Sequence, residues 1–599
     1  MDLRFSDAQP TDAERAVVIA TVPQAETVEQ PGRVVRGGHA ARDQRHRLLP
    51  ALAAVQAEIG HVSEGALMEI CRRLVVPPAE AYGVASFYAL IHTDERSPRV
   101  AHLCDDVGCA PFGADELIAQ VEARLGPAGS DADGVAWERS PCLGQCDRAP
   151  VAYLQLAGDH DQVVAGAQAR DVDHLVGRLR GDAAAPEPPV AFPQQGESGL
   201  KLLARVGSVD PSSLDSHREH GGGAALERAL ELGPDGVRAE VAAANLRGRG
   251  GAAFPAAVKF NAVAAADGAD KHVICNADES EPGTFKDRVL LEGDPFRLLE
   301  AMTIAGYATG AQHGWIYVRG EYPEATRRLE RAIAACRDAG LLGADVAGAG
   351  FAFDVELRRG QGAYICGEKT ALMESIEGHR GEPRNKPPFP TDAGLFGQPT
   401  LINNVETLFD VTDIVRDGGS AFAATGTPDS TGHRLFCLSG AIATPGVYEV
   451  PFGITLGELL ELGGGVDGEL GAILLGGAAG SFVTADQLDL PLTFEATSQR
   501  GLALGSGVVM PFDAATDLGR VVARIAAFFR DETCGQCVPC RVGVVRQEEA
   551  LARYLSNGRD RVELDLLHDI DRAMTDASIC GLGQTAASAV RSAIRQELV

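Results

Sequence analysis

The sequence lacks a long hydrophobic run. No stretch of about 18 apolar residues occurs in the 599-residue chain, which argues against a membrane-spanning helix. The short apolar run AVVIATV at residues 16–22 has no basic segment before it and no small-residue cleavage motif soon after it. We therefore predict no secretory signal and expect a cytoplasmic protein.

Positive charge is also in short supply. The sequence has 54 Lys and Arg residues against 83 Asp and Glu residues, which gives a net charge of −29. A field of this sign argues against binding of nucleic acid or of an anionic membrane through overall charge. With 45% hydrophobic and 23% charged residues, the composition is otherwise that of a globular protein, and the length predicts roughly three to five domains.

Cysteine is sparse but clustered. In a reducing compartment, clustered cysteines indicate metal ligands rather than disulfides. Cys534, Cys537 and Cys540 form a C-x2-C-x2-C motif that can turn three sulfurs toward one [4Fe-4S] cluster. Cys580 is the only cysteine that follows in the sequence, so we predict it as the fourth ligand. Zinc is the main alternative, although its ligands more often come in pairs.

A second group of four cysteines lies in the N-terminal third. Cys104 and Cys109, followed by Cys142 and Cys146, give the pattern C-x4-C…C-x3-C, and each pair follows a predicted strand. Four thiolates on two adjacent loops suit a [2Fe-2S] cluster, with zinc or a redox disulfide as alternatives. We interpret the five isolated cysteines as buried structural thiols: Cys71, Cys275, Cys336, Cys366 and Cys437.

The order of the predicted elements divides the chain into seven segments. The composition and periodicity predict a disordered extension at 1–42, a helical region at 43–98, a strand–helix–strand–strand–helix unit typical of a thioredoxin-like fold at 99–181, a proline-rich linker at 182–204, a large α/β domain at 205–425, a β-rich unit with one helix at 426–512 and a helical bundle at 513–599. The bundle is predicted from apolar residues that recur at spacings of three and four, beginning with Leu518 and Val522. We therefore predict a multidomain α/β protein.

Three glycine-containing segments stand out in the large α/β domain. LRGRGGAAFPAAVKF, at 246–260, fits a G-x-G-x-x-A pattern but follows a predicted helix, so it is a weak dinucleotide-binding fingerprint. Its glycines still allow close approach of backbone N–H groups to a phosphate, with Arg249 and Lys259 adding charge. The other segments are HVICNADESEPGTFKDR and GAYICGEKTALMESIEGHRGEPRNKPPFP, with LINNVETL after them. Each alone could be an ordinary loop, but beside two iron–sulfur sites they indicate the two-electron entry point of an electron-transfer protein.

These segments together resemble the NADH-oxidising flavoprotein subunit of respiratory complex I. CGQCVPCR with the later Cys580 resembles its cluster-bearing bundle, the unit at 426–512 is similar to its β-grasp module, and the N-terminal third resembles its thioredoxin-like [2Fe-2S] companion. The resemblance covers residues 45–180 and 205–599. Such fusions occur in the diaphorase subunits of NAD-dependent formate dehydrogenases and NAD-reducing hydrogenases, and SICGLGQ is more similar to those enzymes than to complex I.

The resemblance implies FMN as a cofactor, with NAD or NADP as a substrate that exchanges a hydride with it. The nucleotide is expected to stack on Phe254 and Phe389, with Glu281 and Lys386 as polar contacts, and Glu281 and Lys259 are the candidate catalytic residues. The FMN contacts that the resemblance implies are Gly248, Arg249, Gly250, Gly251, Lys259, Asn276, Asp278, Glu279, Ser280, Tyr364, Gly367, Glu368, Ile402, Asn403, Asn404 and Thr407.

One position departs from the family pattern. Where the family usually has Gly-Glu-Glu, this chain has Gly367-Glu368-Lys369. A carboxylate there favours NAD and repels the 2′-phosphate of NADP, whereas a cation attracts it. Our hypothesis is that Lys369 shifts specificity toward NADP, and the alternative is a lysine that turns to solvent.

No sequence motif for molybdopterin or nickel is present, nor any additional group of ferredoxin cysteines. We therefore expect another chain to handle the primary substrate. Our first choice is a large molybdenum- or tungsten-containing formate dehydrogenase subunit, with nickel–iron hydrogenase subunits second and a complex I module third. The alternative from another class, a non-catalytic iron–sulfur scaffold, predicts neither flavin absorbance nor ferricyanide reduction with NADH.

Overall fold

The computed structural model describes residues 5–23, 29–30, 33–34, 43–182, 190–268 and 270–599, and parts of the expected extension and linker lie outside these ranges. One described part of the extension is ordered, contrary to the prediction. Helix α1 (Asp12–Thr21) begins with a capping box between Thr11 and Glu14 and packs against α3 (Leu48–Ile59) and α4 (Glu64–Leu74). The polar composition outweighed this short capping signal in the prediction.

The N-terminal third carries a four-stranded sheet beside a helical layer. The sheet has the order β4-β3-β5-β6, in which β3 and β4 are parallel and the other pairs are antiparallel. The predicted strand–helix–strand–strand–helix order is present, with β6 in addition. The elements are α5 (Pro78–Ala85), β3 (Arg99–Cys104), α6 (Ala114–Leu125), β4 (Val135–Ser140), β5 (Val151–Leu156), β6 (Gln162–Ala165), α7 (Ala167–Arg170) and α8 (Val172–Arg180).

The large α/β domain is built on a parallel sheet with the order β10-β7-β8-β9. Its strands contain fully buried apolar residues, because helices cover them, as is typical of parallel sheets. The elements are α9 (Leu214–Glu219), α10 (Ala224–Ala243), α11 (Ala256–Ala265), β7 (His272–Ala277), α12 (Lys286–Gly293), α13 (Pro295–Thr309), β8 (His313–Val318), α14 (Pro323–Asp338), β9 (Asp354–Arg359), α15 (Lys369–Ile376), α16 (Pro390–Ala393), β10 (Thr400–Asn404), α17 (Val405–Asp417) and α18 (Gly419–Ala423).

A β-grasp module and a helical bundle follow. The module has a five-stranded sheet of order β12-β11-β15-β13-β14, in which β11 and β15 are parallel. Its elements are β11 (His433–Leu438), β12 (Gly446–Pro451), α19 (Leu456–Leu462), β13 (Leu470–Leu475), β14 (Ser481–Val483), α20 (Phe494–Gln499) and β15 (Val508–Asp513). The bundle comprises α21 (Leu518–Glu532), α22 (Val538–Ser556), α23 (Arg561–Ala577), α24 (Gly581–Thr585) and α25 (Ser588–Arg595).

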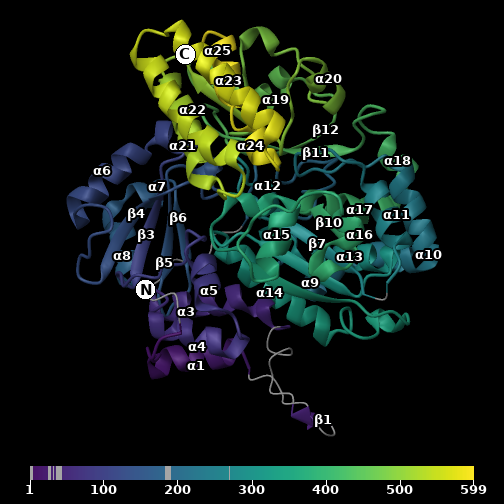
Figure 1. The fold of residues 1–599 in the computed structure, drawn as a ribbon. Helices are drawn as coiled ribbons and strands as arrows, with labels where there is room; N and C mark the ends of the chain where they lie inside the picture. The colour runs from purple at the N-terminus through teal and green to yellow at the C-terminus, as the bar shows by residue number, and fades with distance from the viewer. Residues whose placement is uncertain (1–4, 24–28, 31–32, 35–42, 183–189, 269) are drawn as a thin grey trace.

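These parts meet near the middle of the molecule. In Figure 1 the yellow bundle lies above both the blue thioredoxin-like domain and the teal parallel-sheet domain. Loops from all three domains therefore converge between them. In the described ranges, no helix has both the length and the apolar character that crossing a membrane requires.

Candidate functional site

One candidate site lies at the carboxyl edge of the parallel sheet. Asn403 and Asn404 end β10, and Asn276 lies near the end of its neighbour β7. The Lys259 ammonium, from α11, donates to Ile402 O at 2.7 Å and to Asn403 Oδ1 at 2.5 Å. The carboxyl edge of a parallel sheet is where ligands bind in such folds.

The predicted glycine loop lies against this edge, between α10 and α11 as expected. A Cβ atom on Gly250 would lie 3.1 Å from the Asn404 Cβ, so the loop backbone approaches β10 closely. Gly248 N donates to Phe254 O at 2.9 Å and closes the loop, while Gly251 faces Gly505 of the β-grasp module. The structure thus brings the loop and the strand ends together.

Two buried polar atoms at this edge lack partners among the described residues. These atoms are Nδ2 of Asn403 and Oδ2 of Asp278, and burial raises the pKa of Asp278 well above its usual range. Asn276 Nδ2 donates to Gly367 O at 2.8 Å, which joins the third predicted segment to the strand ends. Because buried polar groups normally have hydrogen-bond partners, the unpartnered amide nitrogen and carboxyl oxygen fit a polar bound group such as FMN.

Cations and aromatic rings border the same site. Lys386 Nζ lies 2.7 Å from Glu368 Oε1, and Lys369 is exposed. Burial, reinforced by the charge of Lys369, lowers the pKa of Lys259 to about 8. Phe254 and Phe389 are each 51% exposed, which is unusual for large apolar side chains. This combination fits an anionic nucleotide with a flat base.

Two side chains of the predicted FMN site form ion pairs or hydrogen bonds with other parts of the protein. Arg249 Nε lies 3.0 Å from Asp410 Oδ2 and its guanidinium is fully buried, so the charge that we expected it to add at the glycine loop is not available there. Its backbone N donates instead to Thr407 Oγ1 at 2.9 Å. The Glu279 carboxylate accepts from the backbone N of Asp287 and of Arg288 at the start of α12.

Glu281 connects the site to the β-grasp module. Its carboxylate accepts from Tyr364 Oη at 2.5 Å and from Ala479 N at 2.9 Å, and burial raises its pKa to about 7. The sequence prediction missed the loop GGAAG at 476–480, although its three glycines were a signal of close backbone approach. Ser280 and Tyr364 line a cavity of about 190 Å3 together with Cys142 of the thioredoxin-like domain.

The four cysteines of the thioredoxin-like domain are buried together. Cys104, Cys109, Cys142 and Cys146 are between 1% and 4% exposed, and the Cys142 and Cys146 sulfurs lie 3.4 Å apart. The Asp106 carboxylate joins the two loops, because it accepts from Val107 N at 2.7 Å and from Cys142 N at 3.0 Å. None of the four is in a disulfide, so the donor set fits a four-thiolate cluster.

The C-terminal cysteines form a second, less buried group. Cys540 and Cys580 are 5% and 7% exposed, whereas Cys534 and Cys537 are half-buried. Burial and the three neighbouring thiols of Cys537, Cys580 and Cys534 together raise the pKa of Cys540 to about 12, so the four cysteines lie close together. Cys537 is the N-cap of α22, where the helix dipole favours negative charge.

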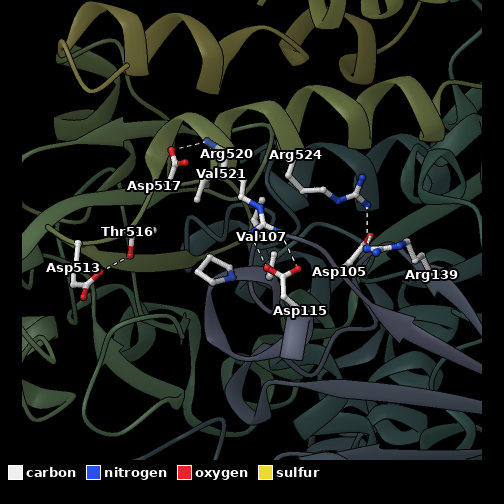
Figure 2. Close-up of a pocket in the computed structure, with 13 residues that line it drawn as sticks. Asp105, Val107, Asp115, Arg139, Asp513, Thr516, Asp517, Arg520, Val521 and Arg524 are labelled. Atoms are coloured by element: carbon white, nitrogen blue, oxygen red, sulfur yellow. Dashed lines mark hydrogen bonds and ion pairs between the residues drawn. The ribbon is translucent and has the colours of Figure 1, made fainter. Parts of the chain in front are cut away.

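Helix α21 ties the two cysteine groups together. It leads directly to Cys534, and its Arg520 and Arg524 pair with Asp115 at 2.6 Å and with Asp105 at 3.3 Å. Figure 2 shows these side chains around a pocket of about 400 Å3 between α21 and the loop that follows Cys104. The bundle is therefore anchored on the thioredoxin-like domain.

Comparison with known families matches three regions of the chain. The family described as the Nuo51 FMN-binding domain matches residues 241–413, the thioredoxin-like [2Fe-2S] ferredoxin family matches 37–180, and the NADH-ubiquinone oxidoreductase-F iron-sulfur binding region matches 520–596. The three families define an iron–sulfur flavoprotein. They also favour iron over zinc at both cysteine groups.

Individual relatives agree with these matches. One NADH-quinone oxidoreductase subunit of Rhizobium meliloti is 42% identical over 398 residues, 66% of this chain and 94% of the relative. The NADP-reducing hydrogenase subunit HndC of Solidesulfovibrio fructosivorans is 41% identical over 390 residues, 64% of this chain and 79% of the relative. A chain of an NAD+-reducing [NiFe]-hydrogenase crystal structure has a TM-score of 0.79 at 33% identity, covering 92% of both chains.

The chain belongs to the family of complex I-like NADH-binding flavoproteins, fused here with a thioredoxin-like [2Fe-2S] domain. Its cofactors are FMN, a [2Fe-2S] cluster and a [4Fe-4S] cluster, with NADH as substrate. The predicted fold class is confirmed. The predicted domain boundaries and the roles of individual residues stay predictions.

Proposed function

We propose that this chain is the diaphorase subunit of an NAD(P)-dependent formate dehydrogenase. It exchanges a hydride with the nicotinamide nucleotide and single electrons with a separate molybdenum- or tungsten-containing subunit that oxidises formate or reduces CO2. The observation that carries the diaphorase role is the pair of buried polar atoms without partners in the described part of the chain, Asn403 Nδ2 and Asp278 Oδ2, at the carboxyl edge of the parallel sheet in a chain that also holds two groups of four cysteines. The sequence SICGLGQ around Cys580 favours a formate dehydrogenase or a hydrogenase over complex I, and formate dehydrogenase is our first choice between the two.

Each part of the site has a distinct role in this proposal. FMN, when bound, supplies the conversion between two-electron and one-electron transfer. Asn403 and Asp278 orient it through their free polar atoms, and Lys259 holds the Asn403 side chain in place. Glu281, with a pKa of about 7, can hold or release a proton beside Tyr364 at neutral pH.

A hydrogenase is the second candidate for the assembly. The likeness to the NAD+-reducing [NiFe]-hydrogenase extends over 92% of both chains, so it includes the fused thioredoxin-like domain as well as the flavoprotein region. A partner with nickel in place of molybdenum or tungsten would be served by the same diaphorase chemistry. The two assemblies therefore differ in the partner chain rather than in this one.

Elemental analysis of the complex that co-purifies with this chain tests the choice. Molybdenum or tungsten together with iron, and NAD(P)+ reduction by formate, is the expected result. Nickel with H2-dependent reduction would replace formate dehydrogenase by hydrogenase. Iron alone, with no activity on formate or H2, would leave either a complex I module or a diaphorase that has dissociated from its partner.

The nucleotide preference is proposed to depend on Lys369. Together with Lys259 and Lys386 it places a third cation beside the nucleotide side of the site, which favours the 2′-phosphate of NADP. We expect Lys369→Glu to lower kcat/KM for NADPH relative to NADH by about tenfold, which corresponds to roughly 1.4 kcal/mol. Lys369→Met separates loss of the cation from gain of the carboxylate. A strong preference for NADH that neither change alters would contradict this role.

A further inference from the structure

Two buried arginines of the parallel-sheet domain end on the thioredoxin-like domain. Arg319 follows β8, and one of its terminal nitrogens donates to Glu279 O at 2.7 Å while the other donates to Cys142 O at 2.7 Å. Glu279 belongs to the proposed flavin loop and Cys142 to the [2Fe-2S] group. A single guanidinium therefore bridges the two cofactor loops, and it is 3% exposed.

The second arginine fixes the next part of the same cysteine loop. Arg288, on α12, donates through Nε to Gly144 O at 3.2 Å and pairs with the Asp147 carboxylate at 3.0 and 3.1 Å. A Cβ atom on Gly144 would collide with the Tyr322 hydroxyl, so the loop backbone lies directly on this domain. The segment from Cys142 to Asp147 is thus held by side chains from outside its own domain.

The two arginines differ in how their charge is balanced. Arg288 faces two carboxylates, those of Asp147 and Glu292, the latter at 3.4 Å. Arg319 is paired with one, Glu321, at 2.9 Å. Both guanidiniums hold the loop in place, but Arg319 is the one that donates to the backbone carbonyl of a cysteine in the group and has the smaller compensating charge.

We propose that Arg319 is a positioning residue that raises the reduction potential of the [2Fe-2S] cluster. The inference rests on the proposed function, because it assumes a cluster at the four buried cysteines beside a flavin loop. A hydrogen bond and a positive charge next to a ligating cysteine favour the reduced cluster, which carries one more negative charge. The low exposure of the site makes this effect larger than it would be in water.

Glu321 provides a prediction of opposite sign. Its carboxylate offsets the charge of Arg319, and both side chains line the cavity between Cys142 and Ser280. Removing the negative charge while Arg319 remains leaves a more positive environment. We therefore expect Arg319→Gln to lower the potential of the [2Fe-2S] cluster and Glu321→Gln to raise it.

The test is an EPR-monitored redox titration of the purified complex with chemical reductant, in which the [4Fe-4S] signal serves as an internal reference. Arg319→Gln should lower the [2Fe-2S] midpoint potential and leave the [4Fe-4S] midpoint potential unchanged. Arg319→Lys keeps the charge, so its [2Fe-2S] midpoint potential should lie close to that of wild type. Arg288→Lys is the matched control, with an expected loss of thermal stability but little change of potential. If Arg319→Gln fails to load the cluster, Glu321→Gln decides alone.

Unchanged [2Fe-2S] midpoints in both Arg319→Gln and Glu321→Gln, or shifts of equal sign, would overturn the inference. Because the titration uses no nicotinamide nucleotide, its outcome is separate from the diaphorase function. If NADH reduces the wild-type protein but the variants show no shift of the [2Fe-2S] midpoint potential, only the role of Arg319 is rejected. Shifted midpoints in a protein that binds no FMN would retain that role and reject the diaphorase proposal.

Discussion

The two groups of cysteines sit in opposite environments. The cysteines predicted to hold the [2Fe-2S] cluster are all buried, and side chains of the parallel-sheet domain and of α21 hold their loops. In the group predicted to hold the [4Fe-4S] cluster, Cys534 and Cys537 are half-buried, and the adjacent Val538 and Val542 on α22 are 58% and 47% exposed. The first group is enclosed by the chain, while the second lies at its surface.

This difference separates two roles for single electrons. A cluster at the surface can approach a redox centre in another chain more closely than an enclosed cluster can. We therefore infer that electrons enter or leave for the partner at the C-terminal group. The [2Fe-2S] group then exchanges electrons with the flavin site alone, and the variants below test this division.

The largest expected effect is the loss of one cluster or the other. We expect Cys537→Ser to abolish the [4Fe-4S] EPR signal and to reduce formate- or H2-dependent NAD(P)+ reduction to background, because the route to the partner is cut. Cys146→Ser should abolish only the [2Fe-2S] signal and retain a substantial part of that turnover. Equal losses of turnover in both variants would show that the enclosed cluster also lies on the route to the partner.

A second contrast compares a buried ion pair of the parallel-sheet domain with a surface ion pair of the helical bundle. Arg249 is fully buried against Asp410, so Arg249→Met leaves a buried carboxylate without its cation, at a cost of about 3–5 kcal/mol. The matched change Arg553→Met breaks the pair with Glu563 on the surface of the bundle and should have little effect. Thermal unfolding with FMN release as a second readout measures both. Similar losses of stability in the two variants would mean that the buried ion pair contributes no more to stability than the surface pair does.

Local patterns predicted much of this arrangement, since they act over a few residues. The spacing of the cysteines identified both cluster groups, and apolar periodicity placed most strands and helices of the thioredoxin-like domain. The N-cap at Thr11 was an equally local signal, but the polar surroundings obscured it.

Long-range partners could not be predicted in this way. Asp410, which withdraws the Arg249 side chain from the glycine loop, lies 161 positions further along the chain, and Ala479 lies 198 positions after Glu281. No periodicity or motif connects such pairs, because their contact depends on how whole domains pack. The same holds for Arg319 and Cys142, whose hydrogen bond crosses a domain boundary.

The buried carboxyl group of Glu281 is expected to make the stability of the protein depend on pH. Burial raises the pKa of Glu281 to about 7 from a usual value of 4.5, so the folded state binds its proton more tightly than the unfolded state does. The stability from this group is complete below about pH 4.5 and is lost as the pH rises through about 7. The free energy of unfolding of Glu281→Gln should therefore rise relative to that of wild type by about 3 kcal/mol between pH 4.5 and pH 8. Thermal unfolding of both proteins across this range measures the difference. A stability difference that does not change with pH would show that Glu281 stays ionised in the folded protein.

The smallest expected effect compares one glycine beside each cluster. A Cβ atom on Gly108 would lie 2.8 Å from the Cys146 sulfur, so Gly108→Ala must displace a ligand in the enclosed group, at a cost of about 1–3 kcal/mol. Gly581, next to Cys580, is exposed and has open space around the same position, so Gly581→Ala is the matched control. We expect a lower yield of [2Fe-2S] signal per chain for Gly108→Ala and an unchanged [4Fe-4S] signal for Gly581→Ala. Equal losses would mean that the surface group is packed as tightly as the enclosed one, and the inferred division between them would lose its structural basis.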